Sequence, residues 1–244
     1  MRVWWKVTQY YLAVAVRQRA GWLVIACGAL LVLGGAVVRD FHFGSAEARF
    51  LTDYSASVVA LAGTLLLALL VPALFHDSLR NGTAVSLLMH GARRETLLLA
   101  QLSAAVVVLG WLLLVCVLGY GATMMALGHA AEMESGMRLL ARGALPLLVI
   151  AAAGGCASTL TRAPFLATLL TLGFSVAGHL SAAAGSALAH AQGAAHVAWF
   201  VLGCCVPDFA LFDTLPYLAA LGYAGAFVLL YAGAGVWLFS RREF

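Results

Sequence analysis

The sequence predicts an all-α polytopic membrane protein with six transmembrane helices, an N-terminal interfacial helix and both termini in the cytoplasm. Hydrophobic residues make up 64% of the 244 residues, charged residues only 10%, and the mean hydropathy is +0.98. A soluble domain of this length needs far more polar surface to cover its core. The charged residues are also clustered, which leaves six uncharged windows that are each long enough to cross a bilayer as a helix.

These windows divide a single transmembrane domain, residues 1–244, into spans and connecting segments. The six expected spans are 21–38, 54–74, 97–119, 143–160, 164–184 and 217–239. Residues 75–96 are polar and lie between the second and third spans. Residues 185–216 are rich in Gly, Ala and His and are expected not to span, with a short helix or re-entrant piece around 194–205.

Residues 1–20 have the pattern of a helix lying in the membrane interface. On a helical wheel, Trp4, Val7 and Tyr11 share one face, whereas Lys6 and Arg17 share another. Such a helix would place its aromatic face in the membrane and its basic face near anionic headgroups. The alternative is a basic membrane-proximal tail in which Trp and Tyr are belt residues.

The distribution of positive charge predicts the orientation. With a cytoplasmic N-terminus, ten of the 14 Lys and Arg residues fall in inner segments and four in outer segments. The excess on the inner side agrees with the positive-inside rule. Seven of the ten acidic residues then fall outside: Asp40, Glu47, Asp53, Glu132, Glu134, Asp208 and Asp213.

No motif in the sequence indicates catalysis on this chain. A phosphate-binding G-x-x-x-x-G-K-[ST] loop, an H-E-x-x-H motif and a G-x-S-x-G motif are all absent. We therefore expect no catalytic residues, no cofactor and no metal site. His190 and His196 are six residues apart and do not share a helix face, so they are a weak metal signal.

Four residues of the outer half are candidates for contact with a substrate or ligand. His179 lies near the outer boundary of the fifth span, where a satisfied boundary histidine is the alternative to a ligand contact. His190, His196 and Asp208 follow in the outer segment.

The layout and the polar segment resemble the membrane subunit of a type 2 ABC transporter, an exporter permease of six spans. In that family an acidic residue at the end of span two precedes a G-[ST] pair, a Leu-rich turn and an Arg-bearing segment. The matching residues are Asp77, Arg80, Asn81, Gly82, Thr83, Leu87, Leu88, Arg93 and Arg94. Asp77 departs from the family's usual Glu by one carbon. VPDFALFD at 206–213 and FSRREF at 239–244 are also similar to the family.

The resemblance implies a permease in the bacterial inner (plasma) membrane that pairs with a second copy or a sister permease. Two copies of a separate ABC ATPase would bind ATP and Mg²⁺ and dock on residues 77–94. Substrate would pass along the permease interface, where spans one, two and five meet. Membrane lipid is a further expected partner and nucleic acid is not. The long uncharged pathway favours a lipidic or amphipathic cargo.

Three alternatives remain. Leu74, Phe75, Asp77 and Gly82 also resemble a stretch of the haem-export permeases of cytochrome c maturation. The chain could instead be a membrane anchor that recruits an ATPase to an envelope machine without forming a pathway. An intramembrane enzyme is disfavoured, because no catalytic cluster recurs at membrane depth.

Overall fold

The structure is a computed structural model that describes residues 2–35, 47–190, 197 and 205–241. All regular secondary structure in these residues is helical. The helices are α1 (Arg2–Arg17), α2 (Arg19–Gly34), α3 (Glu47–Arg80), α4 (Thr83–Met89), α5 (Arg94–Ala126), η3 (Ala130–Glu132), α6 (Met133–Leu160), α7 (Pro164–His190), α9 (Leu211–Thr214) and α10 (Tyr217–Ser240).

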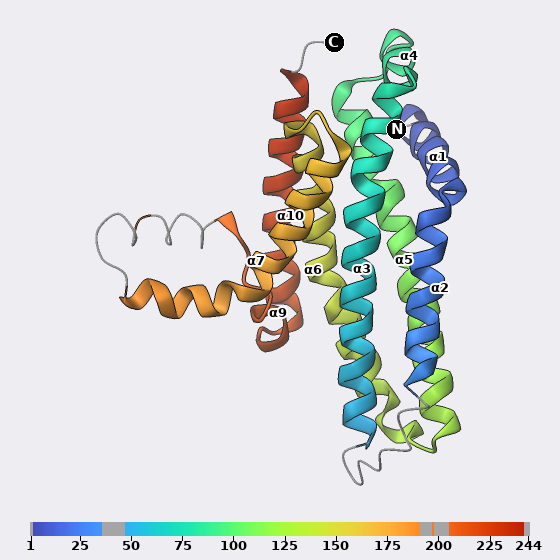
Figure 1. Cartoon of the computed structure of the whole chain (residues 1–244), viewed down its shortest axis with the longest axis vertical. Helices are drawn as coiled ribbons and strands as arrows, with labels where there is room; N and C mark the ends of the chain where they lie inside the picture. Colours follow the sequence, from blue (N-terminus) through green and yellow to red (C-terminus); the bar gives the residue numbers. More distant parts are fainter. Residues whose placement is uncertain (1, 36–46, 191–196, 198–204, 242–244) are drawn as a thin grey trace.

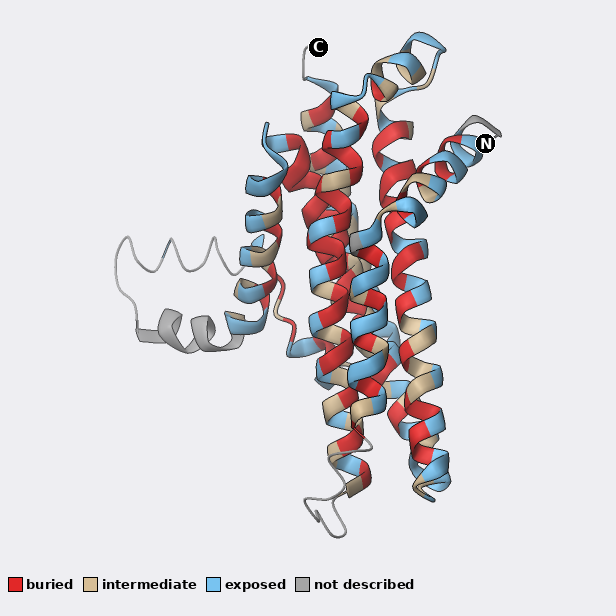
Figure 2. Ribbon diagram, turned by 45° about the vertical axis from the view of Figure 1, so that its right-hand side comes forward, coloured by how far each residue is buried: buried red, intermediate tan, exposed pale blue. Residues whose placement is uncertain are grey.

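Helix α6 is the centre of the bundle and packs against α3, α5, α7 and α10 (Figure 1). Every residue from 149 to 159 is buried, and most of them are Ala, Gly, Ser or Thr. Figure 2 shows buried residues running through the middle of the bundle, with exposed residues on its outer faces. Small side chains at helix contacts allow the close backbone approach that packing within a membrane requires.

Among the described residues, five helices are long and apolar enough to cross a membrane: α3, α5, α6 with η3, residues 164–181 of α7, and α10. The protein is therefore a polytopic helical membrane protein. The first expected span, 21–38, corresponds to α2. With 16 residues, α2 is too short to cross a membrane alone, but α1 and α2 together are long and apolar enough. The two helices form a pair bent by 66°. Six spans and the orientation of the termini stay predictions.

The polar segment 75–96 begins differently from the expected loop. Helix α3 continues through Pro72 as far as Arg80, so Asp77 and Arg80 lie on its last turns. Pro72 does not end the helix, and the buried residues Leu70, Val71, Leu74 and Phe75 pack around it. With 34 and 33 residues, α3 and α5 are about 50 Å long, so both extend beyond a hydrocarbon layer about 30 Å thick.

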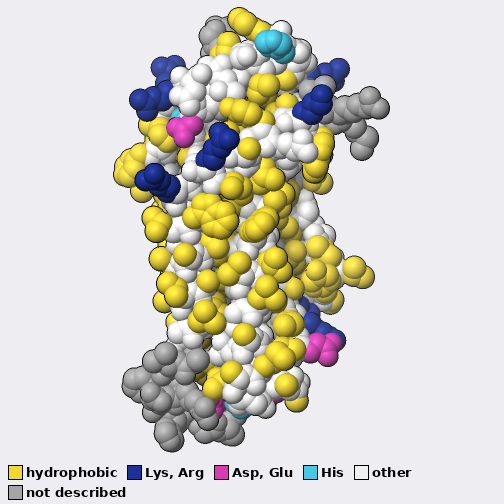
Figure 3. Space-filling view, turned by 90° about the vertical axis from the view of Figure 1, so that its right-hand side faces the viewer, with side chains coloured by type: hydrophobic (Ala, Val, Ile, Leu, Met, Phe, Trp, Pro, Cys, Tyr) yellow, Lys and Arg dark blue, Asp and Glu magenta, His cyan; other side chains and the backbone are white. Residues whose placement is uncertain are grey.

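The two ends of the bundle differ in charge. The beginning of α1, the end of α10 and the whole of α4 lie at one end (Figure 1). Figure 3 shows Lys and Arg side chains gathered around that end, above a broad hydrophobic waist. The described acidic residues belong mostly to the opposite end, near the start of α3, the start of α6 and α9.

The N-terminal helix is held against the bundle by part of its predicted apolar face. Val7 and Tyr11 are buried and α1 packs on α5, while Trp4 is exposed. The predicted apolar face of α1 is therefore only partly buried: Val7 and Tyr11 pack against the bundle, and Trp4 does not. This leaves Trp4, Trp5 and Tyr10 on the outer surface.

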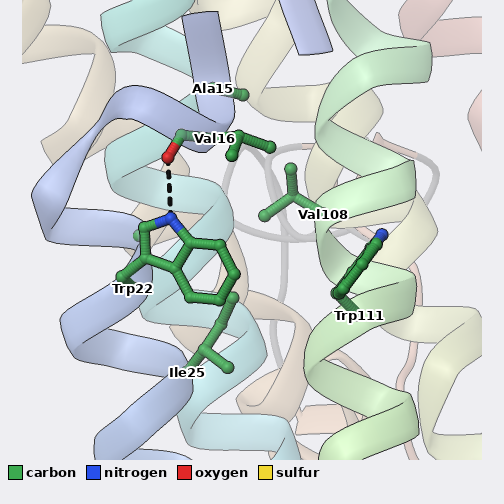
Figure 4. A pocket seen from close by; sticks show the side chains of 7 residues that line it. Ala15, Val16, Trp22, Ile25, Val108 and Trp111 are labelled. Carbon is green, nitrogen blue, oxygen red and sulfur yellow. Dashed lines mark hydrogen bonds between the residues drawn. The ribbon is translucent and has the colours of Figure 1, made fainter. Parts of the chain in front are cut away.

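A tryptophan fixes the bend between α1 and α2. The indole Nε1 of Trp22 donates a hydrogen bond of 2.7 Å to the backbone oxygen of Val16, at the end of α1 (Figure 4). The last carbonyls of a helix have no partner within the helix, and this bond supplies one. Trp22, Ile25, Val108 and Trp111 line an apolar cleft of about 180 Å³ beside the bend.

We predict that Trp22→Phe lowers the free energy of unfolding by about 0.5–1.5 kcal/mol, because the Val16 carbonyl loses its hydrogen bond. The measurement is a thermal melt of the detergent-solubilised protein, followed by size-exclusion chromatography. Trp111→Phe is the matched control, since it removes the same atoms from the same cleft without breaking that bond. Equal losses in both variants would contradict the role of the indole N–H.

Candidate functional site

The polar segment turns back on itself at two glycines. Asn81 and Gly82 form a turn after α3, and the φ of +69° at Gly82 is a left-handed conformation that other residues rarely adopt. The chain then forms α4, and a second turn at Gly91, with φ +86°, leads to α5. Both glycines allow a short helix to stand between the ends of two long ones.

Helix α4 is anchored on one face and projects on the other. Ala84 is buried, and Leu87 and Leu88 are half-buried against the core. Met89 is 82% exposed, and Ser86 and His90 are exposed as well. A large apolar side chain at a protruding polar tip is suited to contact with another protein.

The predicted charged residues of this segment separate into two groups. Asp77, Arg80 and Arg93 are exposed, and no ion pair joins Asp77 to either arginine in the part of the chain that the structure describes. Arg94 instead turns inward and donates to the backbone oxygens of Phe239 at 3.2 Å and Ser240 at 2.9 Å. The first three residues are thus available to a partner, whereas Arg94 joins the start of α5 to the end of α10.

Buried polar residues lie directly behind the exposed ones. The two ring nitrogens of His76 lie 3.0 Å from the Pro72 oxygen and 3.3 Å from the Thr161 oxygen. The side-chain amide of Gln101 donates to Ser78 Oγ at 3.0 Å. These contacts tie the last turns of α3 to the α6–α7 connection and to α5.

His76, Ser78 and Gln101 were not predicted from the sequence as residues of this site. Ser78 could have been found, because it continues the buried positions Val71, Leu74 and Phe75 at helical spacing. The expected end of the second span at residue 74 separated Ser78 from this pattern.

We predict that Arg94→Ala lowers the free energy of unfolding by about 1.5–3 kcal/mol, because two carbonyl oxygens at the end of α10 lose a charged donor. Arg93→Ala removes the same side chain from the neighbouring exposed position and should change stability by less than about 0.5 kcal/mol. Thermal melting of the two purified variants in one detergent makes the comparison. A loss of stability in Arg93→Ala as large as that in Arg94→Ala would show that the inward contact is unimportant.

At the end of the bundle opposite α4, Asp208 forms hydrogen bonds that hold the fold together. Its carboxylate accepts hydrogen bonds from Ser181 Oγ at 3.1 Å and from the Ala210 backbone N–H at 3.0 Å. Its own backbone N–H donates to the Tyr223 hydroxyl at 2.9 Å. Asp208 therefore joins the segment before α9 to α7 and α10, and its carboxylate is engaged in contacts of the fold.

The histidine candidates are placed only in part. His179 is exposed on α7, with its ring centroid 5.1 Å from that of Phe209 in an edge-on arrangement. His190 is the last residue of α7, but its side chain lies outside the described residues, as does all of His196. Within the described part of the chain, no three His, Cys, Asp or Glu side chains are grouped so as to hold a metal.

A cluster of aromatic rings packs the segment before α9 against α7. Phe209 packs against Phe174, Phe212 and His179, and its backbone N–H donates to the Gly178 oxygen at 3.1 Å. A Cβ at Gly178 would lie 2.6 Å from Phe209 Cε2. The close fit of this ring requires glycine at 178.

We predict that Gly178→Ala destabilises the protein by about 1–3 kcal/mol, because the rigid ring of Phe209 must move to accommodate the added methyl group. Gly173→Ala on the same helix is the control, since nothing lies within 4 Å of its added Cβ. Replacing glycine inside a helix removes its entropic penalty, so this control should be neutral or slightly stabilised. The midpoints of thermal unfolding in detergent give both values, and equal midpoints would contradict the packing argument.

Comparisons with known proteins identify no family: no protein-family model matches the sequence, and no curated protein does.

Proposed function

We propose that this chain is the membrane-spanning permease subunit of an ATP-driven exporter, and that α4 is the segment on which a separate ATPase docks. The observation that carries the proposal is the geometry of α4. It is a short helix with an exposed Met89, carried at the basic end of the bundle between the ends of α3 and α5. The similarity of residues 77–94 to type 2 ABC permeases supports the same conclusion.

The charge at this end supports a cytoplasmic position. Arg80 and Arg93 flank α4, Arg162 lies between α6 and α7, and Arg241 directly follows α10. Basic residues are retained on the cytoplasmic side of bacterial membrane proteins. ATP is present on that side of the membrane, so an ATPase that docks there has access to its substrate.

The connections of α4 suit the transmission of movement. Helix α3 leads into α4 and α5 leads out of it, and Arg94 joins the start of α5 to the end of α10. A displacement of α4 would therefore act on three long helices at once. Under this proposal, closure of an ATPase dimer moves two docked α4 segments, one on each of two permease chains, and the bundles move with them as rigid bodies.

The test is purification of the C-terminally tagged protein from its native host in mild detergent, followed by identification of co-purifying proteins. We expect an ATPase with a phosphate-binding loop at one copy per permease chain. We predict that Met89→Glu and Arg93→Glu each reduce its recovery at least fivefold, a loss of about 1 kcal/mol. Met89→Glu would place a charge at an apolar contact, and Arg93→Glu would reverse the charge beside it.

Arg138→Glu is the matched control for this experiment. Arg138 is also an exposed arginine, but it lies on α6 at the opposite end of the bundle. Its substitution should leave recovery of the ATPase unchanged. A lone oligomer without an ATPase would overturn the proposal. An ATPase that the Met89→Glu and Arg93→Glu variants retain as well as the unaltered protein does would show that it docks elsewhere.

A further inference from the structure

Two connected hollows form one groove on the face of the bundle made by α3 and α7, toward the end opposite α4. The larger, of about 580 Å³, lies among α3, α6, α7 and the segment that includes α9. The second, of about 400 Å³, lies between α3 and α7. They share Ser57, Ala60, Thr64 and His179, so they are continuous. Each volume is within the range of small-molecule sites in proteins.

One part of the groove carries charges of both signs. Asp53 from α3, Arg142 from α6 and Asp213 from α9 all line the larger hollow. Arg142 Nη1 donates to the backbone oxygen of Asp213 at 3.4 Å, and the nearest described cation to Asp53 is Arg49 at 4.0 Å. The groove therefore offers one guanidinium and two carboxylates, which come from three helices that are far apart in the sequence.

The other part of the groove is apolar and open toward the lipid. Leu61, Leu65, Leu172 and Val176 line it, and Leu61 and Val176 are 60% and 57% exposed. Both residues lie within helices that qualify as spans. A ligand could enter this part sideways from the hydrocarbon layer, without first passing through water.

The polar side chains between the two parts have partners of their own. Thr64 Oγ1 and Ser175 Oγ lie 3.4 Å apart and join α3 to α7. Because the two hydroxyl groups bond to each other, a ligand does not have to supply hydrogen bonds to them. The charged part of the groove would therefore bind a polar headgroup, and the apolar part would bind a hydrocarbon chain.

We propose that this groove binds a phospholipid whose headgroup carries both a phosphate and a primary amine. The phosphate pairs with the guanidinium of Arg142, the amine donates to the carboxylates of Asp53 and Asp213, and one acyl chain lies along Leu61, Leu65 and Val176. Charge complementarity selects this class, because an anionic lipid without an amine would meet two carboxylates and one guanidinium. The groove lies between α3 and α7, the second and fifth expected spans, so the inference deepens the proposed function by naming a lipid class for the expected pathway. It rests on that proposal only for transport, because lipid binding is measured without an ATPase.

The test is native mass spectrometry of the delipidated protein in detergent, titrated with dioleoyl phosphatidylethanolamine. We expect one tightly bound lipid per chain, at least tenfold tighter than dioleoyl phosphatidylglycerol. Dioleoyl phosphatidylcholine keeps the charges but lacks N–H donors on its nitrogen, so it should bind at least fivefold more weakly than phosphatidylethanolamine. These comparisons use the unaltered protein and do not depend on a variant folding.

Substitutions then locate the site. Arg142→Gln should weaken phosphatidylethanolamine at least tenfold, since a charge-assisted hydrogen bond is lost. The double variant Asp53→Asn, Asp213→Asn should remove the preference over phosphatidylglycerol. Arg138→Gln, four residues before Arg142 on α6, pairs with the exposed Glu134 and does not line the groove, so it should bind as the unaltered protein does.

Three results would overturn the proposal. Equal binding of the three lipids would show that the charged part does not recognise a headgroup. An effect of Arg138→Gln as large as that of Arg142→Gln would place the lipid elsewhere. A dimer without bound lipid in the same spectra would show that a second copy of the chain covers the groove.

Discussion

The close approach of α6 to its neighbours is the constraint on which the rest of the bundle depends. A Cβ at Gly155 would lie 2.8 Å from Leu102 Cδ2, and one at Gly235 would lie 3.4 Å from the Cα of Cys156. The backbones of α6 and α10 are thus nearly in contact. The hydrophobic effect does not drive helices together inside a lipid bilayer, because lipid tails are as apolar as the side chains. Van der Waals contacts between closely packed helices are therefore a main source of the stability of the bundle.

This packing also decides which regions can move separately. The core of α6, from residue 149 to 159, is buried on all sides, and α3, α5, α7 and α10 surround it. Such a core responds to force by moving as a unit, because packed interiors do not deform continuously. Helices α1 and α2 contact α3 and α5 and have no comparable contact with α6, so the bend at Trp22 joins them to the core from outside.

The sequence predicted the class of fold well, because uncharged windows are a direct consequence of the bilayer's thickness. Five of the expected spans coincide with helices that can cross a membrane. The bounds were predicted less well. Helices α3 and α5 extend past their windows, because a helix can continue in water where its charged residues, such as Asp77 and Arg80, remain solvated.

Residues brought together by folding were the hardest to predict. Asp53, Arg142 and Asp213 are separated by most of the chain, and nothing in their local spacing indicates that they share a groove. Asp208 lies in a recognisable motif, yet its carboxylate bonds to Ser181 and Ala210. The motif at 206–213 therefore drew attention to this segment, but it did not show that Asp208 bonds within the fold whereas Asp213 lines the groove.

Helix α3 connects the two proposed sites. Its first half carries Asp53 and Thr64, which line the groove, and its last turn carries Arg80, which precedes α4. The helix is continuous through Pro72 and packs against α6 along its length. If an ATPase displaces α4, α3 carries that displacement to the wall of the groove. The 3.4 Å contact between Thr64 Oγ1 and Ser175 Oγ is near the limit for a hydrogen bond, but α3 and α7 also pack against each other and against α6. The two walls of the groove therefore move together with the core, because packed helices shift as a unit, and α3 links a molecule bound in the groove to an ATPase docked at its far end.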